Sequence, residues 1–282
     1  MAERANVYLR ISNSAENIAL VRQALSGVAE QVDLPAGALN DIRTAATEAC
    51  NNVALHAYAG AEGRLEVEIG CHADALAVVV RDRGTGIQPR IRAQSDNALG
   101  IGLAIIQALA RRVEFNDPPG GGTEVRMEFG ASPAHGRLAR AGVSRPPESA
   151  DDGAELASTT VLAIAPSLLA GSVLPRVLTV LAARAGFTTD RISDVQMIAD
   201  ALAAQVRDAG GGDEIRLTAR TARRRVELAV GPLANGAARE LVESSRGDGV
   251  ASLIGKLSDE HRIDGTPGAR SSTLILALAD RA

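Results

Sequence analysis

Apolar and polar residues along the chain follow two different periods, which predict a mixture of helices and strands. From position 18 to 32 apolar residues recur every three or four positions, as on one face of a helix. Proline is favoured as the first residue of a helix, so Pro35 predicts a second helix that runs to about Ala57. A third helix is expected at about 101–111, and the expected strands lie at 7–11, 65–69, 76–80 and 123–129. Helices mixed with antiparallel strands predict an α+β fold, with the helices on one face of a sheet.

The same order of elements recurs in the second half of the chain. Without a gap, and at an offset of 153 positions, Tyr8–Ile11 matches Val161–Ile164 and Asp41 matches Asp194. The order is completed by strands near 214–218, 225–230 and 273–278 and a helix near 250–257. Chance similarity between two helices rich in alanine and leucine would imitate part of this match. The recurrence of every element favours a domain duplicated in tandem, with a period much longer than that of a solenoid repeat.

The segment between the two halves has a different character. Residues 131–157 are rich in proline, glycine, serine and charged residues and show no apolar period. Such a composition predicts a linker. The expected boundaries are therefore 1–130 for the first domain, 131–157 for the linker and 158–282 for the second copy.

The composition excludes several classes of function. Aromatic residues make up 2% of the chain and tryptophan is absent, so stacking platforms for single-stranded nucleic acid are not expected. The net charge of -4 also argues against a nucleic-acid partner. Cys50 and Cys71 are too few for a disulfide framework, which favours a reduced cytosol. The start of the chain is unlike a signal peptide, and the most apolar run, 161–174, is shorter than the ~20 residues that span a bilayer, so a soluble, cytoplasmic protein without a membrane partner is predicted.

The second predicted helix carries a candidate catalytic pair, Glu48 and Asn52. Residues four apart on a helix share one face, with Cβ atoms about 5–6 Å apart. A carboxylate and an amide oxygen placed in this way can polarise a hydroxyl and bind Mg²⁺. The pair is also compatible with an ordinary solvated polar face.

An Asp-x-Gly-x-Gly sequence, Asp82–Gly86, follows an apolar strand directly. An ionised carboxylate only accepts hydrogen bonds, so Asp82 can select the amino group of adenine over the carbonyl of guanine. Gly84 and Gly86 would let the backbone pass close to a flat ring. A simple Asp-Gly turn is the alternative.

Two further glycine-rich segments lie later in the same half. Gly100 and Gly102 open the third predicted helix, where free backbone amides make a cradle for phosphate. They do not form a dinucleotide-binding motif, because the position of the third glycine is Ile105 and no strand precedes them. Residues 120–123, a triple glycine and Thr123, precede the last strand and alone are equally typical of a hairpin loop.

Taken together, the order and placement of these four segments resemble the ATP-binding fold of the GHKL superfamily, which includes gyrase, histidine kinases and MutL. This Bergerat-type fold is a two-layer α/β sandwich. The string T-E-A-C-N-N-V-A-L-H-A-Y at 47–58 is similar to the RsbW-like anti-sigma-factor serine/threonine kinases of bacterial partner-switching systems. The resemblance covers about residues 7–130 closely and 160–280 only in the order of elements.

The resemblance implies a role for each motif. Glu48 would be the general base and Asn52 the Mg²⁺ ligand, while Asp82 would bind adenine with Thr123 behind it. The residues implied to bind ATP are Asn52, Asp82, Gly84, Gly86, Gly100, Gly102, Leu103 and Thr123. The segment between Gly86 and Gly100 would be a lid over the triphosphate.

Other reactive or charged residues have simpler interpretations. Arg90 and Arg92 in the lid segment are candidates for phosphate contacts or ordinary surface arginines. His56 is interpreted as the tail of its helix, because a histidine kinase would need a dimerising helical hairpin. Cys50 is expected to be a small buried hydrophobe. The basic cluster 220–225 suggests an anionic partner or a solvated strand face.

The second copy is expected not to bind ATP. The ungapped offset places Ala201 opposite Glu48 and Gln205 opposite Asn52, and Gly231-Pro232 stands where the first copy has its Asp-x-Gly-x-Gly sequence. Since the resemblance implies dimers for single-domain members, the inert copy is predicted to pack on the first as a built-in pseudo-dimer partner.

These observations predict an ATP- and Mg²⁺-dependent anti-sigma kinase. By resemblance, it would phosphorylate a serine of a STAS-domain anti-anti-sigma protein and otherwise sequester a sigma factor. The main alternative is a non-catalytic interaction protein in which bound ATP changes the affinity for a partner. An ATP-hydrolysing conformational machine would need a transducer domain, which the second half does not resemble.

Overall fold

The computed structural model describes residues 4–85, 97–118, 120–133, 136–145, 156–208, 213–234, 236–243, 251–265 and 271–281. The chain divides into two compact units, Met1–Ala157 and Ser158–Ala282. Each unit has its own set of antiparallel strands and its own buried apolar side chains, and each is described by itself.

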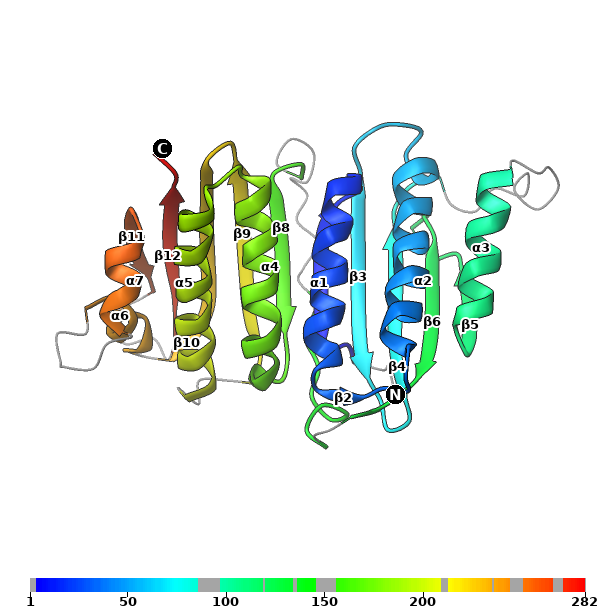
Figure 1. Cartoon of the computed structure of the whole chain (residues 1–282), viewed down its shortest axis with the longest axis horizontal. Helices are drawn as coiled ribbons and strands as arrows, with labels where there is room; N and C mark the ends of the chain where they lie inside the picture. The colour runs from blue at the N-terminus through cyan, green and yellow to red at the C-terminus, as the bar shows by residue number, and fades with distance from the viewer. Residues whose placement is uncertain are drawn as a thin grey trace. The chain divides into compact units, whose positions relative to one another are not determined.

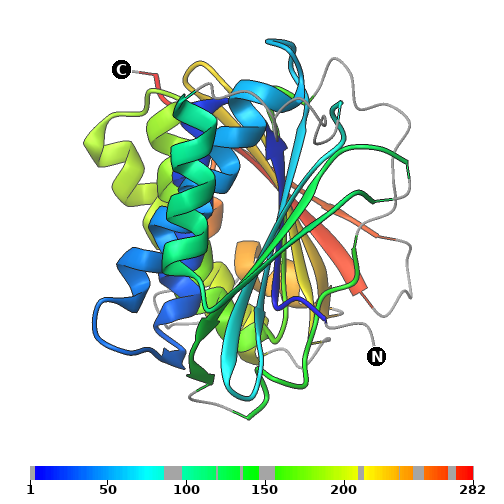
Figure 2. The ribbon, with the colours of Figure 1, turned by 90° about the vertical axis from the view of Figure 1, so that its right-hand side faces the viewer.

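In the first unit, helices cover one face of an antiparallel sheet. Its strands lie in the spatial order β1 (Val7–Ser12), β3 (Arg64–Cys71), β4 (Ala75–Asp82), β6 (Glu124–Gly130) and β5 (Arg112–Asn116). The helices α1 (Ile18–Ala29), α2 (Ala38–Asn52) and α3 (Asn97–Leu109) lie on the same side of these strands (Figures 1 and 2). The short strands β2 (Val32–Asp33) and β7 (Ser132–Pro133) pair separately, and a 3₁₀ turn, Ala15–Asn17, precedes α1. The α+β prediction is confirmed.

Alternation along these strands separates an apolar face from a charged face. Val67 and Val80 pair across β3 and β4, and both side chains are buried in the core. One residue further along β4, Arg81 forms ion pairs with Glu68 and Glu124 on the two neighbouring strands. Since successive strand residues point to opposite faces, the sequence pattern alone determines which face packs against helices.

Helix α2 begins later than predicted, and the helical stretch ends at Ala57 as predicted but with a π-helical last turn. It begins at Ala38 and not at Pro35, because Gly37 adopts φ +83° at the N-cap and turns the chain into the helix only after it. Its regular hydrogen bonding ends at Asn52, and the next five residues, Val53–Ala57, form a π-helical turn. Wider turns of this kind are frequent at functional sites. The turn carries the chain from the catalytic candidates on α2 towards Tyr58.

The second unit has the strand order β8 (Thr159–Ile164), β9 (Ile215–Ala222), β10 (Arg225–Ala234), β12 (Ser271–Ala279) and β11 (Glu260–Asp264). Its helices are α4 (Ala170–Arg184), α5 (Thr189–Asp208), α6 (Ala237–Glu243) and α7 (Ala251–Leu257), and a 3₁₀ turn, Ser167–Leu169, precedes α4. The strand pairings are antiparallel throughout, as in the first unit. The strands β1, β3, β4, β6 and β5 of the first unit therefore correspond, in this order, to β8, β9, β10, β12 and β11 of the second unit.

One helical stretch of the described residues, Ser167–Arg184, is long and apolar enough to cross a membrane by length and composition alone. Half of this stretch is buried inside the protein. The apolar run 161–174 contains most of β8 and the start of α4.

The described part of the expected linker packs against the first unit. Leu138 is fully buried, and the side-chain amide of Asn6 donates to the carbonyl oxygens of Leu138 and Ala141. The amide of Val143 donates to the carbonyl of Ala5 at 2.7 Å. Residues 136–145 are therefore docked on the unit, a feature that the absence of an apolar period conceals.

Candidate functional site

The oxygen atoms of Glu48 and Asn52 meet the backbone of α3. A Cβ atom added at Gly102 would lie 3.2 Å from Glu48 Oε2 and 3.5 Å from Asn52 Oδ1. Both polar side chains are half-buried on α2, while Gly102 is buried. The glycine thus allows α3 to approach the two oxygens closely and leaves room beside them. This proximity groups three of the predicted site residues.

Helix α3 starts at Asn97, four residues before the predicted start at 101. Gly100 therefore lies in the first turn of α3 and Gly102 in the second. Only the first amides of a helix lack partners within the helix. The amides of α3 that are free to meet a phosphate therefore lie in the turn that contains Gly100, while Gly102 lies against Glu48 and Asn52 of α2.

Asp82 ends strand β4 as a buried carboxylate, only 4% exposed. Its Oδ1 accepts a hydrogen bond from the Gly84 amide at 2.8 Å, and the Thr123 amide and hydroxyl also donate to the carboxylate. Burial raises the pKa of Asp82 above its usual range, although these donors oppose the shift. A carboxylate has about four acceptor positions, so Asp82 retains capacity for a donor on a ligand.

The loop after Asp82 packs tightly on the end of the π-helical turn. A Cβ atom at Gly84 would lie 1.9 Å from the carbonyl oxygen of Ala57, so only glycine fits there. The Thr85 amide donates to the same carbonyl at 3.0 Å. Gly122 approaches equally closely from the other side: its Cβ would lie 2.0 Å from the Asp82 carbonyl oxygen. The Asp82 loop and the triple-glycine segment are therefore in direct contact with one another.

Tyr58 is a site residue that the sequence analysis did not identify. Its hydroxyl donates to the Arg64 carbonyl at 2.6 Å and accepts from the Arg83 amide at 2.8 Å. The ring lies against Gly63, where a Cβ would approach ring atoms to 2.3 Å. Tyr58 thus ties the start of β3 to the residue after Asp82. The sequence feature that could have identified Tyr58 is its place directly after the predicted helix, in a chain with only two tyrosines.

The remaining candidates have varied positions. Leu103 is half-buried on α3, and His56 is exposed on the π-helical turn. Cys50 is fully buried as expected, and burial raises the pKa of its thiol to about 12. Gly86, Arg90 and Arg92 lie outside the described residues.

The second unit presents different side chains at the corresponding positions. Ala201, opposite Glu48, is buried, and Gln205 stands opposite Asn52. The strand pairings make Ala229 the counterpart of Val79, so Pro232 and Asp82, each three residues further along its strand, correspond. The basic segment 220–225 is the β9–β10 hairpin, where Arg225 forms an ion pair with Glu227.

Residues 11–129 match the family model of the histidine kinase-like ATPase domain. The first unit therefore contains a histidine kinase-like ATPase domain of the GHKL type, which confirms the resemblance found in the sequence.

Two groups of curated relatives match this part of the chain. The chain is 28% identical over 135 residues to the anti-sigma F factor of Pasteuria penetrans, covering 44% of this chain and 90% of that protein. It is 32% identical over 85 residues to the serine-protein kinase RsbW of Bacillus cereus (strain Q1), covering 30% of this chain and 53% of that protein. The chain thus spans about half the length of the RsbW proteins that it matches. These similarities associate the first unit with anti-sigma kinase-like regulators.

Proposed function

We propose that the first unit is an ATP- and Mg²⁺-dependent protein serine/threonine kinase of the anti-sigma type. The observation that carries the proposal is the approach of Gly102 to Glu48 and Asn52, at 3.2 and 3.5 Å from a Cβ position. It joins a base, an oxygen ligand and the phosphate-binding helix in one place. The names of the relatives, anti-sigma F factor and serine-protein kinase, support the same activity.

In this proposal the adenine base is held at Asp82. The carboxylate accepts a hydrogen bond from the exocyclic amino group, while Gly84 and Thr123 hold it in place by their donors. Guanine presents a carbonyl oxygen at that position, which would repel the carboxylate, so ATP is preferred over GTP. Gly84 and Gly86 would line the base, Leu103 would face the nucleotide, and the first-turn amides near Gly100 would bind phosphate oxygens.

Glu48 is proposed to take the proton of the acceptor hydroxyl. The seryl oxygen then forms a bond to the γ-phosphorus, the bond from that phosphorus to the β–γ bridging oxygen breaks, and ADP leaves. A Mg²⁺ ion bound at the Asn52 oxygen would neutralise charge on the phosphates during transfer. The described residues hold no cluster of three His, Cys, Asp or Glu side chains, so the ion would take its remaining ligands from phosphates and water.

The proposed acceptor is a serine of a STAS-domain anti-anti-sigma protein, and the proposed binding partner is a sigma factor. These partners rest on the family alone. Direct nucleic-acid and membrane partners are not proposed, and the proposed compartment is the cytoplasm.

The second unit is proposed to be a degenerate copy of the first that does not bind ATP and acts as its pseudo-dimer partner. The matching strand order and the replacement of Glu48 and Asn52 by Ala201 and Gln205 support this proposal. Light scattering should give the mass of one chain, 29.1 kDa. A stable homodimer formed through the first unit's own surface would contradict the pseudo-dimer.

The activity is tested with purified full chain, radiolabelled Mg·ATP and a panel of STAS proteins. Transfer of label to a serine, lost in Asn52→Ala and retained in Gln205→Ala, is the expected result. ATP binding without transfer to any protein of the panel would favour the non-catalytic alternative.

A further inference from the structure

A pocket of about 320 Å³ opens in the first unit at the far end of α2 from the proposed ATP site. Its walls come from the start of α2, the end of α3 and the end of β6, and its lining includes Ala38, Asp41, Leu109, Phe129 and Gly130. Ala38 and Asn52 are the two ends of α2, about 20 Å apart at 1.5 Å per residue. The pocket is therefore separate from the site that would bind ATP.

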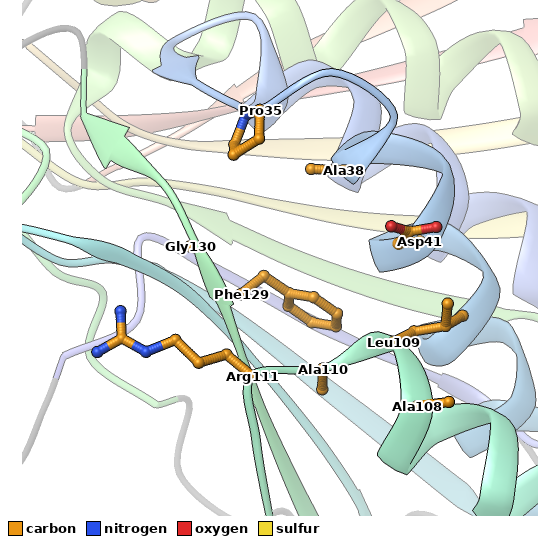
Figure 3. A pocket seen from close by; sticks show the side chains of 9 residues that line it. All are labelled: Pro35, Ala38, Asp41, Ala108, Leu109, Ala110, Arg111, Phe129 and Gly130. Carbon is orange, nitrogen blue, oxygen red and sulfur yellow. The ribbon is translucent and has the colours of Figure 1, made fainter.

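Figure 3 shows how the side chains of this pocket are directed. The Phe129 ring points into it from β6, and Asp41 lies on the α2 side. The Arg111 side chain points away from the ring and from Asp41, and its guanidinium pairs with Asp74 at 3.1 Å. The pocket thus combines an aromatic ring and a carboxylate, while the nearby cation has a partner elsewhere.

The strand pairings identify the same place in the second unit. Tyr8 of the first unit corresponds to Val161 of the second. When the strand pairs are followed from these two residues to the edge strands, Arg126 corresponds to Ile275 and Glu114 corresponds to Arg262. Leu109 and Leu257 are the last residues of α3 and α7, which precede these edge strands. On the helices, the offset of 153 positions found in the sequence makes Arg191 the counterpart of Ala38 and Asp194 the counterpart of Asp41. The corresponding pairs are Ala38 and Arg191, Asp41 and Asp194, Leu109 and Leu257, Arg111 and Asp259, and Gly130 and Ala279.

In the second unit this place is filled by the side chain of Arg191. Its Nε donates to the Ala279 carbonyl at 2.9 Å, and its Nη1 donates to the Leu257 carbonyl at 2.8 Å and to Asp194 at 3.0 Å. Its Nη2 donates to Asp259 at 2.6 Å. The side chain is only 15% exposed. Every one of these acceptors belongs to a residue whose counterpart lines the pocket of the first unit.

We propose that the pocket of the first unit binds an arginine side chain supplied by a partner protein. The first unit has Ala38 where the second has Arg191, so the space that a guanidinium fills in one unit is open in the other. Asp41 keeps the carboxylate of Asp194, and Leu109 ends α3, where the partial negative charge of the helix favours a cation. Phe129 adds a ring on which a guanidinium can stack. An arginine fits this donor and acceptor arrangement better than a lysine, because its planar group donates in several directions at once.

The probe is Nα-acetyl-arginine-N-methylamide, titrated into the full chain and followed by NMR of the Leu109 methyl groups and the Gly130 amide. Saturable shifts at these positions are expected, and the uncharged citrulline analogue should bind at least about tenfold more weakly. Ala38→Arg should abolish the shifts, because the new side chain fills the pocket as Arg191 does. The matched control is Ala36→Arg, at an exposed position outside the lining, which should leave them intact.

A second variant tests the same claim by strengthening the binding of the probe instead of abolishing it. Arg111→Asp introduces the carboxylate that Asp259 supplies in the second unit, so the probe should bind several-fold more tightly. Equal binding of the citrulline analogue, or binding that survives Ala38→Arg, would overturn the proposal. Absence of saturable shifts in both the natural chain and Arg111→Asp would also overturn it. ATP binding should be unchanged in Ala38→Arg, so this proposal and the kinase proposal fail separately.

Discussion

The two units share one strand order but differ at the few polar positions on which chemistry depends. The spatial order is β1, β3, β4, β6, β5 in the first unit and β8, β9, β10, β12, β11 in the second. At the helix positions of Glu48 and Asn52, however, the second unit carries the buried Ala201 and Gln205. The apolar alternation that builds the sheet is thus separable from the side chains that give it a function.

The two sites in the first unit differ from their counterparts in opposite ways. At the proposed ATP site the first unit has the functional groups, and the second has Pro232 and Ala234 at the strand end where the first has Asp82 and Gly84. At the pocket the second unit is self-sufficient, because Arg191 fills it. The first unit therefore has the candidate ATP-site residues and an open pocket, whereas the second unit lacks those residues and fills the place of the pocket with Arg191.

Loss of Asn52 should have the largest effect. Asn52→Ala removes the proposed metal ligand, so phosphotransfer should fall by about 10³-fold or more, since metal stabilisation of transferring charge amounts to several kcal/mol. Transfer is measured with radiolabelled ATP and a responsive STAS protein. Gln205→Ala changes the corresponding position of the second unit and should leave the rate unchanged. Full transfer by Asn52→Ala would remove the distinction between the two units.

Gly84→Ala should disrupt the base-binding loop. The added Cβ would lie 1.9 Å from the Ala57 carbonyl, so the loop or the π-helical turn must move. We expect ATP affinity to fall about 100-fold and the free energy of unfolding to fall by ~2–4 kcal/mol, as for other overpacked sites. Calorimetry and urea unfolding measure these two quantities. Gly136→Ala, where no atom lies within 4 Å of the new Cβ, is the matched control and should change neither.

Asp82→Asn should weaken adenine recognition. Replacing a charged acceptor by an amide removes roughly 1.5–3 kcal/mol from a charged hydrogen bond, so ATP affinity should fall about 10- to 100-fold. The preference for ATP over GTP should narrow as well. Asp280→Asn alters a buried carboxylate of the second unit that accepts from the Thr188 amide, and it should lower stability without changing nucleotide affinity. An unchanged ATP-to-GTP ratio in Asp82→Asn would contradict the assigned role.

Tyr58→Phe should have the smallest effect. It keeps the ring against Gly63 and removes only the hydroxyl that joins the Arg64 carbonyl to the Arg83 amide. Each of the two neutral hydrogen bonds lost contributes about 1 kcal/mol to stability, and a loss of about 1 kcal/mol, or roughly fivefold, is expected in ATP affinity. Tyr8→Phe removes a comparable hydroxyl, bonded to Glu66 at 2.9 Å, away from the site. It should lower stability but leave ATP affinity unchanged, and equal losses of affinity in both variants would count against Tyr58.

Much of the fold follows from local pattern. The strand predicted at 7–11 is β1 (Val7–Ser12), and the strand predicted at 76–80 lies inside β4. The edge strands β5 and β11 were missed. β5 is only five residues long, with Val113 and Phe115 as its only apolar residues, and β11 is exposed along its whole length, so neither gives a strong strand pattern.

The unpredicted parts of the site depend on contacts between distant segments. Gly100 and Gly102 hid the true start of α3, because glycine is a poor helix former. The contact of Gly102 with Glu48 and the fit of Gly84 against Ala57 join residues that no local pattern relates. Residue types therefore indicated the chemistry, while the reason for each glycine required the packed structure.

The central claim is that one of the two units binds ATP, and calorimetry of the full chain with Mg·ATP tests it most directly. The account predicts one site per chain, weakened in Asp82→Asn and in Asn52→Ala. Two sites per chain, or no binding at all, would contradict it.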